Sequence, residues 1–275
     1  MFRQTFYFGT IRKYVTLFGT LFDDILIERT DSAGDLTALI KVPITYGPKE
    51  KMLARTLGDP DIDRQTATPT LPVMSFEMTN ISYDSSRKLN TIRRTVVSDS
   101  DPNRMKYQYA PVAYNIGFRL HVYVKNAEDG TKIIEQILPY FTPDWTTTVQ
   151  LIPEMEITLE IPVILDRISQ EDTYDGSFKE RRALTWTLDF TLKGYIYGPI
   201  KKGSIIKFAN TVYYAPTGNL LTGVGNTDPN MYYTVQPGLT ANGQPTANGS
   251  QSIDPNLITA TSDFGYVENV TVLTT

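Results

Sequence analysis

Apolar residues follow a helical spacing in two segments of the chain. Between residues 11 and 22 they recur every three or four positions, which places them on one side of a helix. A second set covers residues 133–138 and ends before Pro139, because proline disfavours helical geometry in the residue that precedes it. The sequence therefore predicts two principal helices. Their apolar positions are Ile11, Tyr14, Val15, Phe18, Leu21 and Phe22 in the first, and Ile133, Ile134, Ile137 and Leu138 in the second.

Other segments alternate apolar and polar residues, the pattern of a strand with one buried and one wet face. The clearest alternations cover residues 112–124, 155–165 and 184–192, and a shorter one covers residues 74–79. Long one-sided strands must bury their apolar faces against another layer. We therefore expect an α+β fold, with a mainly antiparallel sheet and the two principal helices packed on one of its faces.

The segments between these elements carry weaker signals. Residues 39–44 alternate around Pro43, which lacks an amide hydrogen, so this strand is expected at a sheet edge or at a bulge. Residues 49–57 predict a short helix. Residues 85–109 are charged and have no period, which predicts a long loop, and Asp129-Gly130 predicts a turn ahead of the second helix.

The composition changes near residue 208. Residues 215–261 are rich in Gly, Asn, Thr and Pro, which predicts an extended arm without a core of its own. Apolar residues return at 264–273, a stretch that could add as a strand to a sheet edge of this subunit or of a neighbour. The predicted organisation is an α+β domain at 1–207 and an extended arm with a terminal strand at 208–275.

The charge is distributed unevenly. The net charge is −4, and Lys207 is the last basic residue of the chain. Residues 1–207 hold equal numbers of acidic and basic side chains, so the four acidic residues of the arm account for the whole net charge. No basic stripe is visible, which argues against wrapping or reading nucleic acid, because binding DNA releases counterions from a matching row of cations.

Cysteine is absent, which excludes disulfides, thiolate zinc sites and cysteine nucleophiles. No segment has the apolar length of a membrane span, and the first residues lack the pattern of a secretory signal. We expect a soluble protein that is not exported and has no membrane partner.

The sequence predicts no catalytic, cofactor-binding or metal-binding residue. His121, the single histidine, lies on the polar face of its predicted strand and is expected to be exposed or interfacial. The Asp99–Asn103 stretch begins like a calcium loop but has Arg104 where that loop needs glycine. Two acidic clusters are interpreted as solvated loops, and no phosphate-binding glycine motif is present. The clusters are Asp59, Asp61 and Asp63, and Glu171, Asp172 and Asp175.

Interface residues are the remaining candidates. Seventeen tyrosines and twelve phenylalanines provide a ring type that is common at protein interfaces, and Glu156 and Glu160 are expected on the wet face of one strand. Arg12 and Lys13 fall off the apolar stripe of the first helix. The predicted interface set is Arg12, Lys13, Glu156, Glu160, Arg181, Arg182, Phe264, Tyr266 and Val267.

Three ordered segments carry a family resemblance. The first is Ile11–Phe22 continuing into Ile25–Ile27, and the second is Val42–Glu50, followed at a distance by Leu71-Pro72. The third and most specific is Ile134-Glu-Gln-Ile-Leu-Pro-Tyr-Phe-Thr-Pro143, with Arg181-Arg182 and Trp186–Leu188 downstream. With these segments the chain resembles the tail terminator proteins of contractile-tailed bacteriophages, also called tail sheath stabilizer and completion proteins. The residues after 208 depart from the family pattern.

The resemblance implies a structural virion protein and not an enzyme. Six copies would form a ring that caps the head-proximal end of the tail tube, stops tube polymerisation, anchors the last sheath ring and joins the tail to the neck. Its partners would be further copies of itself, the tube protein, the sheath protein and a neck protein. DNA would pass through the channel without specific binding, and assembly would occur in the host cytoplasm. The alternatives are a neighbouring neck or connector protein, a tube or sheath component, and, from another class, a tail enzyme that degrades cell-wall carbohydrate.

Overall fold

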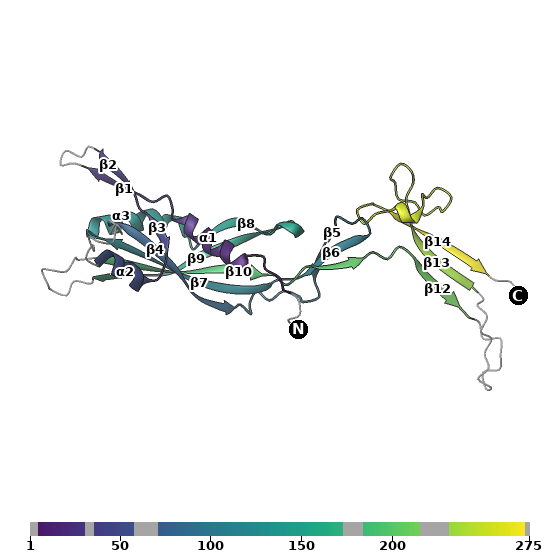
Figure 1. Cartoon of the computed structure of the whole chain (residues 1–275), viewed down its shortest axis with the longest axis horizontal. Coiled ribbons are helices and arrows are strands. Elements are labelled where there is room, and N and C mark those ends of the chain that lie inside the picture. Colours follow the sequence, from purple (N-terminus) through teal and green to yellow (C-terminus); the bar gives the residue numbers. More distant parts are fainter. Residues whose placement is uncertain (1–4, 31–35, 58–70, 173–183, 215–230, 273–275) are drawn as a thin grey trace, which may run out of the picture. The chain divides into compact units, whose positions relative to one another are not determined.

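The computed structural model describes residues 5–30, 36–57, 71–172, 184–214 and 231–272. Contacts divide the chain into two units, residues 1–93 with 110–198 and residues 94–109 with 199–275, and each unit is described by itself (Figure 1). In these described ranges the fold is mostly β, with three α-helices and mainly antiparallel sheets, in agreement with the predicted α+β class. No helix within the described ranges is long and apolar enough to cross a membrane.

The first unit is built on a six-stranded sheet with the strand order β3-β4-β7-β10-β9-β8. All neighbours are antiparallel except β3 and β4. The three longest predicted alternations are confirmed, because two of them form the two central strands of the sheet and the third forms the strand beside them. The strands are β3 (Ile44–Tyr46), β4 (Val73–Tyr83), β7 (Val112–Val124), β8 (Asp144–Ile152), β9 (Ile157–Asp172) and β10 (Leu184–Ile196). The single strand predicted over residues 39–44 is wrong, because β2 (Leu36–Lys41) ends before Pro43 and β3 begins after it, at the border of the sheet.

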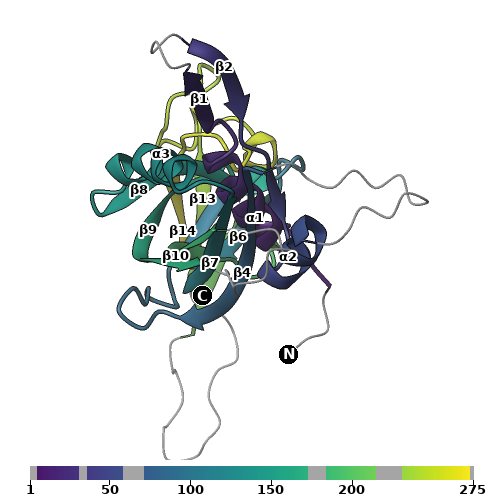
Figure 2. The same cartoon turned by 90° about the vertical axis from the view of Figure 1, so that its left-hand side faces the viewer.

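Two helices contact the apolar face of this sheet. Helix α1 (Thr10–Leu21) places Phe18 between Phe118 of β7 and Phe190 of β10. Helix α3 (Ala127–Ile137) approaches the same face, since a Cβ on Gly130 would lie 2.5 Å from the indole nitrogen of Trp186. Figure 2 shows both helices on the same side of the sheet.

The predicted turn at Asp129-Gly130 is wrong, because both residues lie within the first turns of α3. Asp129 is buried and accepts two hydrogen bonds from Arg29, at 2.6 Å and 2.7 Å. Arg29 belongs to a hairpin of β1 (Leu26–Thr30) and β2 (Leu36–Lys41), which is attached to α3 through this ion pair.

The third helix, α2 (Lys49–Leu57), contacts the opposite, polar face of the sheet. Its Met52 packs against Val73 and Tyr123, whose side chains point away from α1. The Tyr123 hydroxyl is within 3.2 Å of the Ser75 hydroxyl, and burial raises the pKa of Tyr123 to about 12. Part of the predicted wet face is therefore covered by a helix.

The second unit contains two small sheets with the orders β11-β6-β5 and β12-β13-β14. Residues 85–109 were predicted to be a loop, but β5 (Arg94–Ser98) and β6 (Arg104–Tyr109) form a hairpin there, which β11 (Lys201–Ser204) extends. The terminal apolar stretch forms β14 (Gly265–Val272), which pairs with β13 (Met231–Gly238) of the same chain, and β12 (Ala209–Tyr213) completes the sheet.

A small core lies in the part of the chain that was predicted to have none. Leu239, Ile258 and Val267 are buried, and the loop after β13 packs closely on the sheet. A Cβ on Gly238 would lie 2.2 Å from the carbonyl oxygen of Thr246, so this approach requires glycine. The glycines of this region therefore serve close packing as well as chain flexibility.

Candidate interaction surface

Polar side chains form rows across the face of the six-stranded sheet that points away from α1. Strand register sets the rows, because side chains that alternate along each strand meet their cross-strand partners on the same face. One row runs from Ser75 through His121 and Thr187 to Ser169, and the next begins with Glu77. The strands that carry these rows are β4, β7, β10 and β9.

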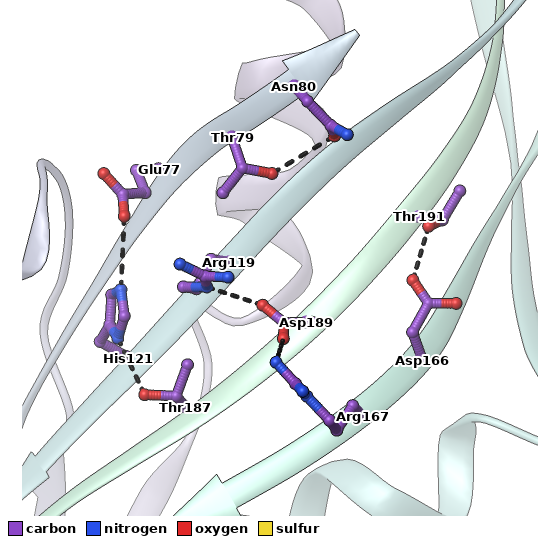
Figure 3. A network of polar contacts seen from close by, with 10 residues as sticks. All are labelled: Glu77, Thr79, Asn80, Arg119, His121, Asp166, Arg167, Thr187, Asp189 and Thr191. Carbon is purple, nitrogen blue, oxygen red and sulfur yellow. Dashed lines mark hydrogen bonds and ion pairs between the residues drawn. The ribbon is translucent and has the colours of Figure 1, made fainter. Parts of the chain in front are cut away.

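The second row is a ladder of alternating charge, formed by Glu77, Arg119, Asp189 and Arg167 (Figure 3). Arg119 Nε donates to Asp189 at 2.7 Å, and the guanidinium of Arg167 donates to the other oxygen of the same carboxylate at 3.0 Å. We call this row the charge ladder. The contacts of Asp189 with Arg119 and Arg167 join three strands, β7, β10 and β9, and at the end of the ladder the Arg167 side chain is 71% exposed.

The charges of the ladder hold one another in the ionised state. Burial acts to raise the pKa of Asp189, but the hydrogen bonds from Arg119 and Arg167 outweigh it and hold the pKa below its usual value. The hydrogen bond to Asp189 likewise raises the pKa of Arg119. The carboxylate is thus ionised and shared between two cations, which suits a structural or docking role and leaves no free acid or base at this position.

His121 lies in the first row with an arrangement that resembles a hydrolase triad. Its Nδ1 is 3.2 Å from the Thr187 hydroxyl, and its Nε2 is 3.6 Å from Glu77, which is too long for a hydrogen bond. His121 is 2% exposed and Thr187 is 9% exposed. The prediction that His121 is exposed or interfacial is wrong, and its burial closes the approach of a substrate carbonyl to the hydroxyl.

Folding should respond to the protonation of His121. Burial lowers the pKa of this imidazole and outweighs the opposing effect of Glu77. Since the unfolded chain protonates near pH 6.5 while the folded chain resists protonation, stability is fully present above that pH and is lost as the pH falls towards the folded-state pKa. We expect the free energy of unfolding in urea titrations to fall as the pH is lowered through about 6.5. His121→Gln should remove most of that change, and an unaltered pH dependence in this variant would contradict the assignment.

The acidic clusters offer no metal site within the described part of the chain. Asp99 is paired with Lys202 at 2.9 Å and Lys106 at 3.3 Å, and the hydrogen bond from Lys202, with further donors, lowers the pKa of Asp99 to about 2. Glu171 is paired with Lys49. No group of three potential metal ligands occurs among the described residues, while Asp59, Asp61, Asp63 and Asp175 lie outside them.

The predicted interface residues of the first unit do not form one surface. Arg12 is exposed on α1, whereas Lys13 donates to the carbonyl oxygens of Gln150 and Leu151 in β8. Glu160 is exposed on β9, on the polar side of the sheet. Glu156 is exposed at the end of a short turn, with a φ of 53°. Arg181 and Arg182 lie outside the described residues.

The other predicted interface residues lie in the second unit. Tyr266 is exposed, Phe264 is half-buried, and their ring centroids are 5.8 Å apart. Val267 is buried and packs against the glycine-rich loop of its own chain.

The sequence did not identify the charge ladder. Its members were visible as polar positions of alternating strands, but the pairing of Arg119 with Asp189 depends on the register between β7 and β10. One hint was present in the sequence: two of the predicted strands carry residues of opposite charge, Arg119 and Asp189, near their middles.

The chain is similar to known proteins along most of its length. A family described as the T4-like virus Myoviridae tail sheath stabiliser matches residues 5–266, which include residues of both units. The prediction that the residues after 208 depart from the family pattern is therefore wrong. The chain is also 29% identical over 227 residues to the tail completion protein gp15 of Enterobacteria phage T4. That alignment covers 80% of this chain and 82% of the phage T4 protein.

Proposed function

Because the chain belongs to the family of T4-like Myoviridae tail sheath stabilisers, we propose that six copies form a ring at the head-proximal end of a contractile tail. The family makes the chain a structural component of a phage tail. In the proposed role, the ring ends growth of the tail tube, anchors the last ring of sheath subunits and joins the tail to the neck, and the finished protein resides in the virion.

The observation that carries this proposal is the extent of the family match. Residues 5–266 include the six-stranded sheet, the three α-helices and most of the small second unit. The phage T4 relative is named a tail completion protein, and the alignment spans similar shares of both chains. A match along most of the chain supports a role that depends on the shape of the whole protein, whereas a match to one motif would support only a local site.

The structure supports an associative mechanism. The charge ladder uses its charges within the chain, and His121 is shielded from substrate. In the described residues, the six-stranded sheet ends at β3 and β8, two borders at which no further strand of the same chain pairs. In our proposal one face of the ring matches the stacking surface of the tube, and the opposite face lacks such a match, so that no further tube subunit adds.

The proposal is tested by assembling tails without this protein and examining them by negative-stain microscopy. We expect tails of irregular length and sheaths that detach, because nothing ends the tube or holds the last sheath ring. Adding the purified full-length protein should restore uniform tails. If tails made without it have normal length and firmly attached sheaths but fail to join heads, the chain is a neck or connector protein and the proposal is wrong.

A further inference from the structure

A groove of about 630 Å³ lies between α1, α3 and the beginning of β8. Four aromatic side chains line it, and one of them, Tyr140, is 67% exposed. Aromatic residues in such a concave site act as anchors when a partner covers them. The aromatic lining consists of Phe22, Tyr140, Phe141 and Trp145.

The charge of the groove limits what it accepts. Asp24 and Glu135 line it, and none of the described lining residues is basic. Lys41 reaches Asp24 at 3.1 Å, but it also faces Asp23 at 3.5 Å, so this single cation serves two carboxylates. Glu135 has no ion-pair partner among the described residues. The groove therefore favours a large apolar side chain accompanied by a cation.

The most specific segment of the sequence builds this groove. Within residues 134–143, Ile134 and Ile137 are buried on the inner side of α3, while Glu135 and Tyr140 are exposed. The cis peptide bond before Pro143 ends the segment ahead of β8. The segment thus joins the helix to the core with one set of side chains and exposes the aromatic and acidic lining with the other.

A complementary feature lies in the connection between β4 and β5. Ile92 is 79% exposed there, Arg93 follows it, and Lys88 is exposed in the same turn. The turn has a defined local conformation, since the backbone amide of Ile92 donates to the Asn90 side chain at 3.0 Å. We call the surface of Lys88, Ile92 and Arg93 the basic knob.

The acidic residue of this turn is already occupied. Arg87 Nε donates to Asp84 at 2.7 Å, and the hydroxyl of Ser86 donates to the same carboxylate at 2.6 Å. Asp84 is therefore already engaged and does not neutralise the cations of the basic knob. Arg93 forms no ion pair with any described residue. The knob offers an apolar tip with a positive charge beside it.

The basic knob and the groove are separated within one subunit. Phe141 of the groove lies 5.2 Å from Phe190, which pairs with Phe118 at the middle of β7. The segment that carries the knob is bonded to the start of β7 at both of its ends, because the amide of Asp84 donates to the Ala113 carbonyl and the amide of Ala110 donates to the Arg93 carbonyl. Five residues of strand, roughly 17 Å, separate these points, so the knob of one chain is too far to fill its own groove.

We propose that the basic knob of one copy docks in the aromatic groove of the next copy, with Ile92 as the apolar anchor and Arg93 facing Glu135. A contact between two different patches of identical subunits is head-to-tail, and it closes into a ring when the rotation between copies allows closure. The inference deepens the proposed ring and rests on it, because it names the surfaces through which neighbouring subunits meet.

Chemical cross-linking tests this contact directly, since the natural chain contains no cysteine. The full-length Ile92→Cys/Tyr140→Cys variant, treated with a short bifunctional maleimide, should give a ladder of covalent multimers on denaturing gels. Mixing the two single-cysteine variants should give only dimers. Ile81→Cys combined with Tyr140→Cys is the matched control, because Ile81 is also an exposed isoleucine of the first unit, and it should give no ladder.

A charge reversal provides the second test. Glu135→Arg should weaken self-association by about tenfold or more in analytical ultracentrifugation, because it places two cations face to face. Adding Arg93→Glu to the same chain should restore most of the affinity. Arg12→Glu, which reverses an exposed charge on α1 outside the proposed contact, is the control and should leave the affinity unchanged.

The outcomes separate this inference from the proposed function. If microscopy shows rings at tail ends but the double-cysteine variant gives no ladder, the ring stands and the knob-and-groove contact is overturned. If Tyr140→Cys cross-links to itself, or to a different tail protein, another surface occupies the groove and the contact is again overturned. A ladder without rings at tail ends would support the contact and contradict the proposed function.

Discussion

Replacing Phe18 with alanine is expected to lower the free energy of unfolding of the first unit by about 3–5 kcal/mol. Phe18 is fully buried and stacks on Phe118, with ring centroids 4.5 Å apart and planes inclined by 9°. It also contacts Phe76 and Phe190, so one side chain joins α1 to three strands of the sheet. Truncation would remove these contacts and leave a cavity that the surrounding sheet cannot collapse to fill.

Tryptophan fluorescence during urea unfolding measures this change selectively. The chain has two tryptophans, Trp145 and Trp186, and both lie in the first unit, so the signal does not report the second unit. Thr16→Ala is the control, because Thr16 is exposed on the same helix and its hydroxyl donates only to the Arg12 carbonyl of that helix. A loss below about 1 kcal/mol for Phe18→Ala would show that α1 does not depend on this aromatic cluster.

The elements with a strong period could be predicted from the sequence alone. The alternation over residues 112–124 coincides with β7, and the three-to-four spacing over residues 11–22 nearly coincides with α1. The apolar face of each of these segments packs against a single layer, so the residues of the segment itself contain the periodic signal. The terminal strand could also be predicted, because its β-prone residues needed only one neighbouring edge.

Features that depend on a partner element could not be predicted in this way. Alternation assigned His121 to the polar face correctly, but it did not show that the row beside α2 is covered. Asp129-Gly130 was interpreted as a turn because the buried partner, Arg29, is a hundred residues away in the chain. The β5–β6 hairpin was missed for a similar reason: its charged residues pair with one another and with β11, as Asp99 does with Lys106 and Lys202.

The same distinction, between signals within one segment and contacts between segments, applies to the candidate surfaces. Arg12 and Glu160 were predicted from exposure alone, and they are exposed. The charge ladder and the aromatic groove require register and packing between elements that are distant in the sequence. Sequence patterns thus located surfaces, whereas the grouping of residues within a surface came from the fold.

The second large effect is expected at the ion pair between Arg29 and Asp129, where the two partners should differ. Asp129 is 2% exposed and Arg29 is 36% exposed. Arg29→Met would leave a buried carboxylate without its cation, and we expect it to lower the free energy of unfolding by about 3 kcal/mol. Asp129→Asn should cost about 1–2 kcal/mol, because the amide oxygen still accepts one hydrogen bond and the guanidinium can reach water.

Urea unfolding followed by tryptophan fluorescence also measures this pair, since Trp186 lies against α3 at Gly130. In the double variant Arg29→Met/Asp129→Asn, the loss should be smaller than the sum of the single losses, because the unpaired buried charge is gone. Gln136→Ala is a control for attachment of the hairpin, as Gln136 donates to the Leu26 carbonyl without carrying charge. If Asp129→Asn costs more than Arg29→Met, or if the two losses add, the burial of Asp129 is not what makes this pair important, and the hairpin must be attached to α3 mainly by its hydrogen bonds to Gln136 and Lys132.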